Sequence, residues 1–168
     1  MDAMQALITR RCVRRFQLKP VTSDLVEQVV DAGRLAPTAR NVQPCEFVVV
    51  TDAGRRSEIA EITDHGKFID EAPVCIVVLS KPTKYYLEDG SAAVTNLLNA
   101  AHAIGLGACW VAGDKKPYAE QILNLCGVPQ EMRLIALVPV GYPDEIPTVE
   151  KRELSDVINW ETYGHKTP

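Results

Sequence analysis

The sequence predicts one domain in which helices cover both faces of a central sheet, an α/β or α+β arrangement with three layers. Two observations support this fold class. Apolar runs rich in β-branched residues alternate along the chain with segments of helical periodicity. The chain has 168 residues, of which 46% are hydrophobic, and this suits one core of ordinary size. We therefore expect a single domain over residues 1–168.

Three buried strands are predicted from short apolar runs at residues 47–50, 73–79 and 134–138. The second run, PVCIVVL, is apolar throughout, which is typical of a strand that is covered on both faces. A fourth, shorter strand is expected at residues 109–111, directly after a glycine-rich turn.

Helices are predicted where apolar residues recur at the spacing of helical turns, at about residues 4–11, 23–36, 55–62, 89–104 and 117–125. The helix at 89–104 has an Ala- and Leu-rich stripe and a second stripe formed by Ser91, Thr95, Asn99 and His102. We expect both of its faces to find partners. The polar tail from about residue 145 to 168 has too few apolar residues for a core of its own and is expected to pack on another surface.

The composition argues against several classes of protein. Lys and Arg number 18 against 22 Asp and Glu, so the net charge of -4 disfavours a general binder of nucleic acid. The five cysteines are odd in number and include no CxxC pair, so we expect neither a disulfide framework nor a zinc site, but a reducing cytoplasm. We see no signal-peptide pattern, and no apolar stretch approaches the ~20 residues of a membrane span.

Motifs for metal and hydrolase chemistry are missing from the sequence. The three histidines lack HxxxH or HExxH spacing, and there is no GxSxG sequence. GLGACW at 105–110 follows a helix and lacks a third glycine, so we reject a dinucleotide fingerprint there. We interpret His102 as a partly buried side chain with its hydrogen bonds satisfied, and Cys75, Cys109 and Cys126 as buried small apolar residues.

Arg10, Arg11, Arg14 and Arg15 form a local basic cluster. Guanidinium groups supply the converging donors that a phosphate needs. Two other interpretations stay open: the arginines solvate a helix end and complement its dipole, or they form an arm that binds nucleic acid.

The loop at residues 37–44 lies between two prolines and precedes a buried strand. Asn41 and Gln43 each offer an amide donor and an acceptor, which a heteroaromatic ring with carbonyl and imide groups can use. The alternative is that Thr38 and Asn41 only satisfy the backbone of the loop itself.

Four motifs stand out in order: RRCVRRF at 10–16, APTARNVQP at 36–44, AAHAIGLGACW at 100–110 and ALVPVGYP at 136–143. Together they resemble the FMN-dependent nitroreductase family, over most of the chain to about Arg152. The resemblance implies an α+β fold in three layers, with a mostly antiparallel central sheet flanked by helices. It also implies a homodimer with two FMN molecules at the subunit interface.

The resemblance implies that three parts of the chain hold the flavin. Arg10, Arg11, Cys12 and Arg14 face its phosphate and its pyrimidine edge, and Cys12 stands where the family often has serine. The loop contributes Pro37, Thr38, Ala39, Asn41 and Gln43 and is expected to reach the flavin of the partner subunit. The backbone near Ala112 and Gly113 and the basic Arg152 supply later contacts with the ring and the phosphate.

The implied activity is electron transfer through FMN from NADH or NADPH to a nitroaromatic, a quinone or a similar flat acceptor. Both substrates use one site in turn, a ping-pong mechanism, and the flavin carries the chemistry, so no catalytic side chain or metal is expected. The chain is short for the family, which predicts an open active site, and the tail is expected to pack on the partner subunit. The alternative is a non-catalytic protein that binds or handles flavin.

Overall fold

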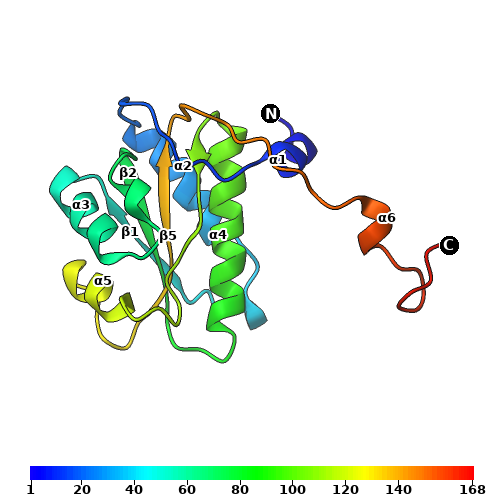
Figure 1. Ribbon diagram of the computed structural model, residues 1–168. Coiled ribbons are helices and arrows are strands. Elements are labelled where there is room, and N and C mark those ends of the chain that lie inside the picture. Colours follow the sequence, from blue (N-terminus) through cyan, green and yellow to red (C-terminus); the bar gives the residue numbers. More distant parts are fainter.

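The computed structural model describes residues 1–168 and has a five-stranded sheet between two layers of helices (Figure 1). The strands are β1 (Cys45–Val50), β2 (Val74–Ser80), β3 (Gly107–Ala108), β4 (Val111–Ala112) and β5 (Arg133–Gly141). Their order is β1-β2-β5-β3, β4 also pairs with β5, and every ladder is antiparallel. The predicted α+β fold with an antiparallel sheet in three layers is confirmed.

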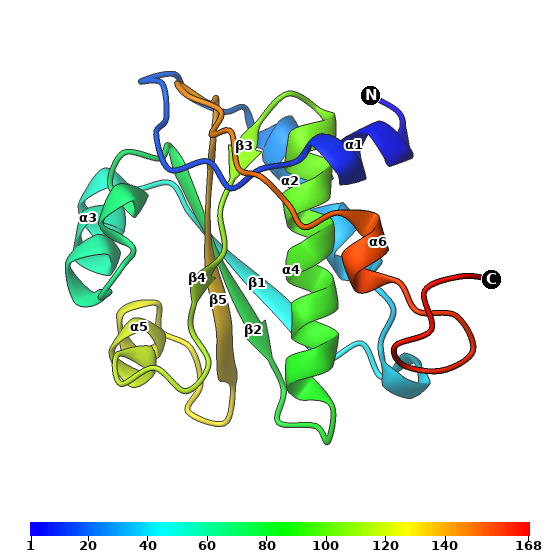
Figure 2. The same cartoon turned by 45° about the vertical axis from the view of Figure 1, so that its right-hand side comes forward.

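Helices cover both faces of the sheet (Figure 2). The helices α2 (Ser23–Arg34) and α4 (Tyr86–Ala103) pack on one face, and α3 (Ala53–Ile62) and α5 (Ala119–Leu125) pack on the other. The short α1 (Ala3–Thr9) lies beside the C-terminal end of α4, and α6 (Leu154–Val157) belongs to the tail. Two 3-10 turns, η1 (Ala39–Asn41) and η2 (Lys67–Ile69), precede β1 and β2.

The strand β2 is buried along its whole length, as its sequence predicts. Because successive side chains of a strand point to opposite faces, Val74, Ile76 and Val78 join the core under α2 and α4. The alternate residues Cys75, Val77 and Leu79 join the core under α3 and α5. One strand therefore supplies both halves of the core.

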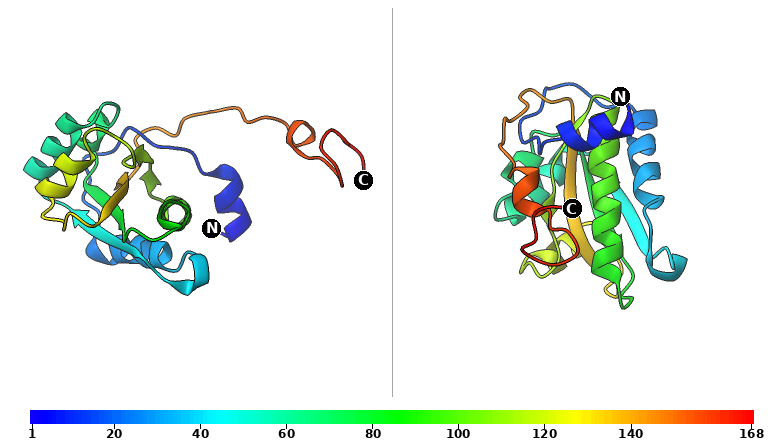
Figure 3. Two further views of the ribbon diagram at one scale, coloured as in Figure 1. Left: turned by 90° about the horizontal axis from the view of Figure 1, so that it is seen from below. Right: turned by 90° about the vertical axis from the view of Figure 1, so that its right-hand side faces the viewer.

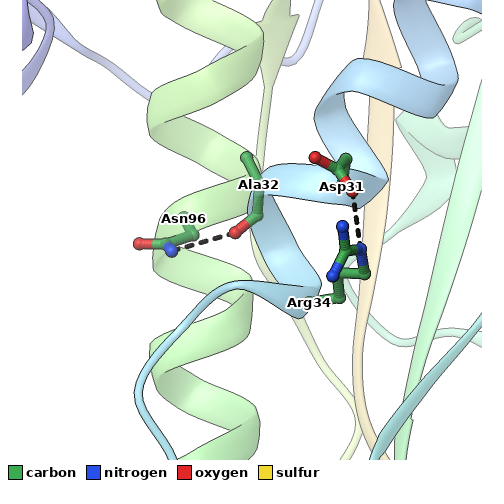
Figure 4. Close-up of polar contacts among 4 residues, drawn as sticks. All are labelled: Asp31, Ala32, Arg34 and Asn96. Atoms are coloured by element: carbon green, nitrogen blue, oxygen red, sulfur yellow. Dashed lines mark hydrogen bonds and ion pairs between the residues drawn. The ribbon is translucent and has the colours of Figure 1, made fainter.

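The contact between α2 and α4 is fixed by small residues and one hydrogen bond. Asn96 Nδ2 donates to the carbonyl oxygen of Ala32 at 2.9 Å, while Arg34 Nε donates to Asp31 Oδ1 at 2.6 Å within α2 (Figure 4). A Cβ atom on Gly33 would lie 2.7 Å from Leu97 Cδ2, so a side chain here would require Leu97 to shift.

The second stripe of α4 is not covered by the domain. Ser91, Asn99 and His102 are half-buried and Thr95 is exposed, whereas Val94, Leu97 and Ala101 are fully buried on the opposite side. A single chain therefore covers only one face of this helix, and a partner for the other face stays a prediction. The open face remains available to a second molecule.

The first helix ends earlier than expected, at Thr9 rather than Arg11. Arg10 has φ -57° and ψ 132°, and the chain then runs extended to a bridge with β3. The tail after Glu145 leaves the domain and projects into solvent (Figure 3). None of the helices combines the length and the apolar character that crossing a membrane requires.

Candidate functional site

Three of the four sequence motifs lie side by side in the structure. We call residues 10–16 the arginine segment. Cys12 forms a parallel bridge to Ala108, and Val13 N donates to Ala108 O at 3.0 Å. Phe16 forms a bridge to Pro143 at the end of the sheet. The arginine segment, the glycine turn and the Gly-Tyr-Pro turn therefore form one end of the molecule.

Gly107 makes this arrangement possible. A Cβ atom at Gly107 would lie 2.7 Å from the side chain of Val13, a residue that is only 4% exposed. The arginine segment can approach β3 only because residue 107 has no side chain.

The arginines of this segment occupy different environments. Arg11 Nη1 donates to the carbonyl oxygens of Ile8 at 3.1 Å and Arg10 at 2.9 Å, so it satisfies the end of α1. The helix-end interpretation therefore describes Arg11. Arg10 Nη1 lies 3.8 Å from Cys12 Sγ, and Arg14 Cζ lies 5.9 Å from the centre of the Phe68 ring.

None of Arg10, Arg11 and Arg14 pairs with a carboxylate, whereas the neighbouring Arg15 lies 3.8 Å from Glu145 Oε2. The positive charges of Arg10 and Arg11 influence His102. Burial, followed by the charges of Arg10 and Arg11, lowers the pKa of His102 below its usual value. The segment is therefore a local source of uncompensated positive charge.

A cavity of about 180 Å³ lies beside Arg14. The predicted site residues Arg14 and Ala112 both line it, together with His65, Phe68, Cys109, Trp110, Val111, Lys116 and Tyr118. The sequence motifs do not include His65, Phe68, Lys116 or Tyr118, and no spacing links these residues to the arginines. The cavity thus joins basic side chains to aromatic rings.

Gly113 has a structural role next to this cavity. Its amide donates to Ile135 O at 3.1 Å, and a Cβ atom there would collide with Leu134. Ala112 is exposed, and its carbonyl oxygen accepts a hydrogen bond from Tyr118. Of the two residues, Ala112 is the one that faces outward.

His102 is held at the end of α4. Its Nε2 lies 2.8 Å from Thr9 Oγ1, and the side chain is half-buried. This agrees with the interpretation of His102 as a satisfied side chain. Cys75 and Cys109 are buried as predicted, at 0% and 1% exposure, whereas Cys126 is only half-buried.

The loop at residues 37–44 has an unusual backbone. Arg40, Asn41 and Gln43 have φ angles of 55°, 56° and 53°. These values lie in the left-handed region, which residues other than glycine rarely adopt. Thr38 Oγ1 accepts a hydrogen bond from Gln43 N at 3.1 Å, so the backbone-satisfying interpretation holds for Thr38. Asn41 and Gln43 are exposed; Gln43 Nε2 donates to the carbonyl oxygen of Asn41 at 3.5 Å, whereas the side-chain amide of Asn41 makes no hydrogen bond within the chain.

Asp89 anchors this loop, a role that no sequence motif indicates. Asp89 is 5% exposed, and its Oδ1 accepts a hydrogen bond from Ala39 N at 2.8 Å. Its Oδ2 has no partner and lines a cavity of about 120 Å³ with Thr83, whose Oγ1 is also unpartnered. The first turn of α4 therefore holds the loop in place.

The loop and the arginine segment lie at opposite ends of α4. Asp89 holds the loop near the N-terminal end, and His102 contacts Thr9 near the C-terminal end. Thirteen residues at about 1.5 Å each separate these positions by about 20 Å along the helix. One chain does not bring the two predicted halves of the site together.

Arg152 is also apart from the arginine segment. It is exposed on the tail, and its Nη2 donates to Asp156 O at 3.2 Å. The predicted phosphate contact therefore lies on a part of the chain that leaves its own domain (Figure 3).

Comparisons with known proteins agree with the fold and with the motifs. The sequence profile described as the Nitroreductase family matches residues 7–67 and 63–142. A "Putative NADH dehydrogenase/NAD(P)H nitroreductase" from Methanothermobacter thermautotrophicus is 33% identical over 153 residues, which cover 88% of this chain and 80% of that protein. An NADPH-flavin oxidoreductase from Vibrio harveyi is 23% identical over 174 residues, which cover 94% of this chain and 72% of that protein.

A solved structure from Desulfovibrio desulfuricans, in complex with FMN, has a TM-score of 0.86 and 29% identity to this chain. The similarity covers 97% of this chain and 98% of that one. The profile match spans well over half of the sequence, and the fold agrees along nearly its whole length. The chain belongs to the nitroreductase family.

Proposed function

We propose that this chain is an FMN-dependent oxidoreductase that passes electrons from NADH or NADPH to a flat acceptor such as a nitroaromatic or a quinone. Family membership supports a flavin-dependent oxidoreductase, and the relatives named for FMN, NADPH and NAD(P)H support the cofactor and the reductant. FMN, when bound, supplies the redox chemistry by taking up a hydride and handing the electrons to the acceptor.

The observation that carries this proposal is the uncompensated charge of the arginine segment. The chain has a net charge of -4, yet Arg10, Arg11 and Arg14 have no acidic partner. Arg11 is occupied by the end of α1, so Arg10 is the free guanidinium nearest to His102. We assign Arg10 to the FMN phosphate, because a dianion gains most from a charged donor without competing carboxylates.

Arg14 and Ala112 suit the ring of the flavin. They line the same cavity, whose walls include the aromatic side chains of Trp110 and Tyr118. A guanidinium there would donate to the pyrimidine edge, and the outward-facing backbone of Ala112 would contact the ring. The donor set and the aromatic walls fit an FMN molecule.

The remaining contacts require a second chain. An isologous dimer that sets α4 antiparallel to its copy places the N-terminal end of one helix beside the C-terminal end of the other. Asn41 and Gln43 of one subunit would then reach the flavin held by Arg10 and Arg14 of the other. This resolves the separation of about 20 Å that α4 imposes within one chain.

Exposed apolar side chains support the same dimer. In α1, Met4, Leu7 and Ile8 are 66%, 55% and 62% exposed, and in the tail Leu154 is 70% exposed. A tail that projects from its own domain can cover such a surface on a partner and carry Arg152 toward the phosphate. The tail from about 145 to 168 therefore belongs to the interface.

The chain supplies binding and orientation and no acid–base catalyst. His102 is tied to Thr9, and its lowered pKa keeps it neutral at physiological pH. We therefore assign proton delivery to solvent. Reductant and acceptor occupy the same face of the ring in turn, which is a ping-pong mechanism.

Flavin spectroscopy tests this function. The purified protein should be yellow, should lose its flavin absorption on anaerobic addition of NADH or NADPH, and should regain it with a quinone. Arg10→Ala should lose flavin, while Arg15→Ala, whose arginine already faces Glu145, should retain it. Bound flavin that neither reductant bleaches would identify a flavin-handling protein instead, and a protein that takes up no FMN would overturn the assignment.

A further inference from the structure

A cavity of about 470 Å³ lies beside α5 and contains none of the residues predicted to hold the flavin. We call it the α5 cavity. Its deepest lining residues are the apolar Met132 and Leu134, which are 5% and 3% exposed. Its exposed polar lining consists of Lys115, Glu120, Asn124, Gln130 and Arg133. An apolar wall with a few charged and amide groups is typical of a site for a small ligand.

The α5 cavity is next to the cavity beside Arg14. Lys116 lines both of them, and both include residues of the core under α3 and α5. In the ladder between β4 and β5, Ala112 pairs with Ala136. Arg133 precedes Ala136 by three residues, which places it about 10 Å along the strand from that pair. An extended nicotinamide dinucleotide is longer than this distance, so one molecule can occupy both cavities.

The cations that line the α5 cavity differ in how closely carboxylates approach them. Lys115 Nζ and Lys116 Nζ lie 3.9 Å and 3.5 Å from a carboxylate oxygen. The carboxylate beside Lys115 is that of Asp114, whose other oxygen accepts a hydrogen bond from Tyr86 Oη at 3.0 Å. Arg133 makes no ion pair. Its guanidinium is therefore free for an anionic ligand.

The lining groups match the adenosine diphosphate end of a nicotinamide dinucleotide. A guanidinium binds two phosphate oxygens through its planar fork. The side-chain amides of Asn124 and Gln130 each offer a donor and an acceptor, which the edge of adenine can use. Glu120 makes no ion pair and can accept a hydrogen bond from a ribose hydroxyl. Met132 and Leu134 supply an apolar surface for the base.

We propose that the α5 cavity binds the adenosine diphosphate end of the reductant, with Arg133 on the diphosphate and the nicotinamide in the cavity beside Arg14. This inference rests on the proposed function, because it assigns the α5 cavity to the reductant of the flavin. A nitroaromatic or quinone acceptor has no nucleotide and leaves the α5 cavity empty. The helix α5 lies on the face of the sheet opposite to α4 (Figure 2), so a dimer formed through α4 leaves this cavity open.

Calorimetric titration of the FMN-loaded protein with ADP-ribose and with its 2′-phosphate tests the site without turnover. At least one of the two should bind, and Arg133→Ala should weaken that binding about tenfold or more. Arg133→Lys keeps the charge without the planar fork and should lose less. The matched control Arg55→Ala removes an exposed arginine of α3 outside the cavity and should bind like the parent. Binding of neither nucleotide, or equal affinity for Arg133→Ala and the parent, overturns the proposal.

Kinetics separate a failure of this inference from a failure of the proposed function. N-benzyl-dihydronicotinamide reduces flavins but carries no nucleotide. In Arg133→Ala, the ratio of kcat/KM for NADH or NADPH to kcat/KM for this reductant should fall about tenfold or more. Flavin that is reduced with an unchanged ratio overturns this inference and leaves the proposed function standing. Bound flavin that no reductant bleaches overturns the proposed function, and with it the assignment of the α5 cavity to a reductant.

Discussion

At the scale of single residues, the four arginines between positions 10 and 15 make different contacts. Arg11 satisfies the carbonyl oxygens at the end of α1, Arg14 lies beside Phe68, and Arg15 faces Glu145. Arg10 is left with a weak contact to Cys12 Sγ and no acidic partner. The sequence shows that arginines gather here, but only the end of α1 at Thr9 decides which of them is free.

Arg10→Ala should weaken FMN far more than riboflavin. A charged hydrogen bond contributes roughly 1.5–3 kcal/mol, which corresponds to an affinity loss of about 10- to 150-fold for the ligand that carries the phosphate. Fluorescence titration of the apoprotein with each flavin measures the difference. Arg15→Ala is the matched control and should change neither affinity. An equal loss for both flavins would place Arg10 away from the phosphate.

His102 makes stability depend on pH. Its pKa is lowered in the folded chain by burial and by Arg10 and Arg11, so below the ordinary histidine pKa of about 6.5 the unfolded chain binds a proton that the folded chain does not. The resulting contribution to stability is complete above about pH 6.5 and is lost as the pH falls from there through the lowered pKa of His102. Urea unfolding measures the free energy of unfolding at about pH 7.5 and about pH 5.5. The decrease between the two pH values should be smaller for His102→Gln than for the parent.

A matched substitution at the exposed His165 in the tail checks that result, because this residue contacts neither Arg10 nor Arg11. His165→Gln should follow the parent at both pH values. If His102→Gln loses as much stability as the parent between the two pH values, burial and the arginine charges do not lower the pKa of His102 in the folded chain.

At the scale of elements, the sequence predicted those whose apolar pattern is decided locally. The apolar run of β2 and the Ala- and Leu-rich stripe of α4 predicted the right structures, because a continuous β-branched run and a 3.6-residue period are both properties of neighbouring residues in the sequence. The predicted end of α1 was wrong. Arg10 and Arg11 favour a helix locally, but pairing with β3 holds the following residues in an extended conformation. Tertiary pairing decided that boundary.

Gly107→Ala should destabilise the contact between β3 and the arginine segment. The new methyl group would meet Val13 at 2.7 Å, and overpacking of this kind costs about 1–3 kcal/mol. Val13→Ala removes Cγ2 at 2.7 Å and Cγ1 at 2.9 Å and leaves only Cβ close to the new methyl group, so the double variant should lose less stability than the sum of the two single variants. Urea unfolding of the four proteins completes the cycle. Strict additivity would show that the two side chains do not meet.

At the scale of the whole molecule, α4 keeps the two halves of the proposed site apart within one chain. Each half of the proposed site stands out as a sequence motif, and the assignment of its residues to the flavin stays a proposal. The placement of the two halves at opposite ends of one helix and the anchoring of the loop by Asp89 both depend on packing. No local spacing encodes them. The open face of α4 and the projecting tail point to assembly as the missing step.

A mixed dimer tests the shared site. Arg10→Ala and Asn41→Ala chains with different tags should each bind FMN poorly as homodimers. In the heterodimer, one site combines both defects and the other has none, so about one FMN per dimer should return. A dimer of two differently tagged Arg10→Ala chains is the control and should recover nothing. A heterodimer that binds no more flavin than its parents would place both residues in a site within one chain.

The order of substrates follows from the same architecture. With one cavity beside Arg14, and with a mechanism that uses none of its titratable groups His65, Cys109, Lys116 and Tyr118, reductant and acceptor have to take turns. Double-reciprocal plots of initial rate against NADH or NADPH, at several fixed quinone concentrations, should give parallel lines, and the quinone should inhibit competitively against the reductant. His102→Gln should leave flavin reoxidation within several-fold of the parent, because loss of a general acid would slow it by about 10²–10⁴. Intersecting lines would require a second substrate pocket, and a hundredfold slower reoxidation with flavin still bound would make His102 the proton donor.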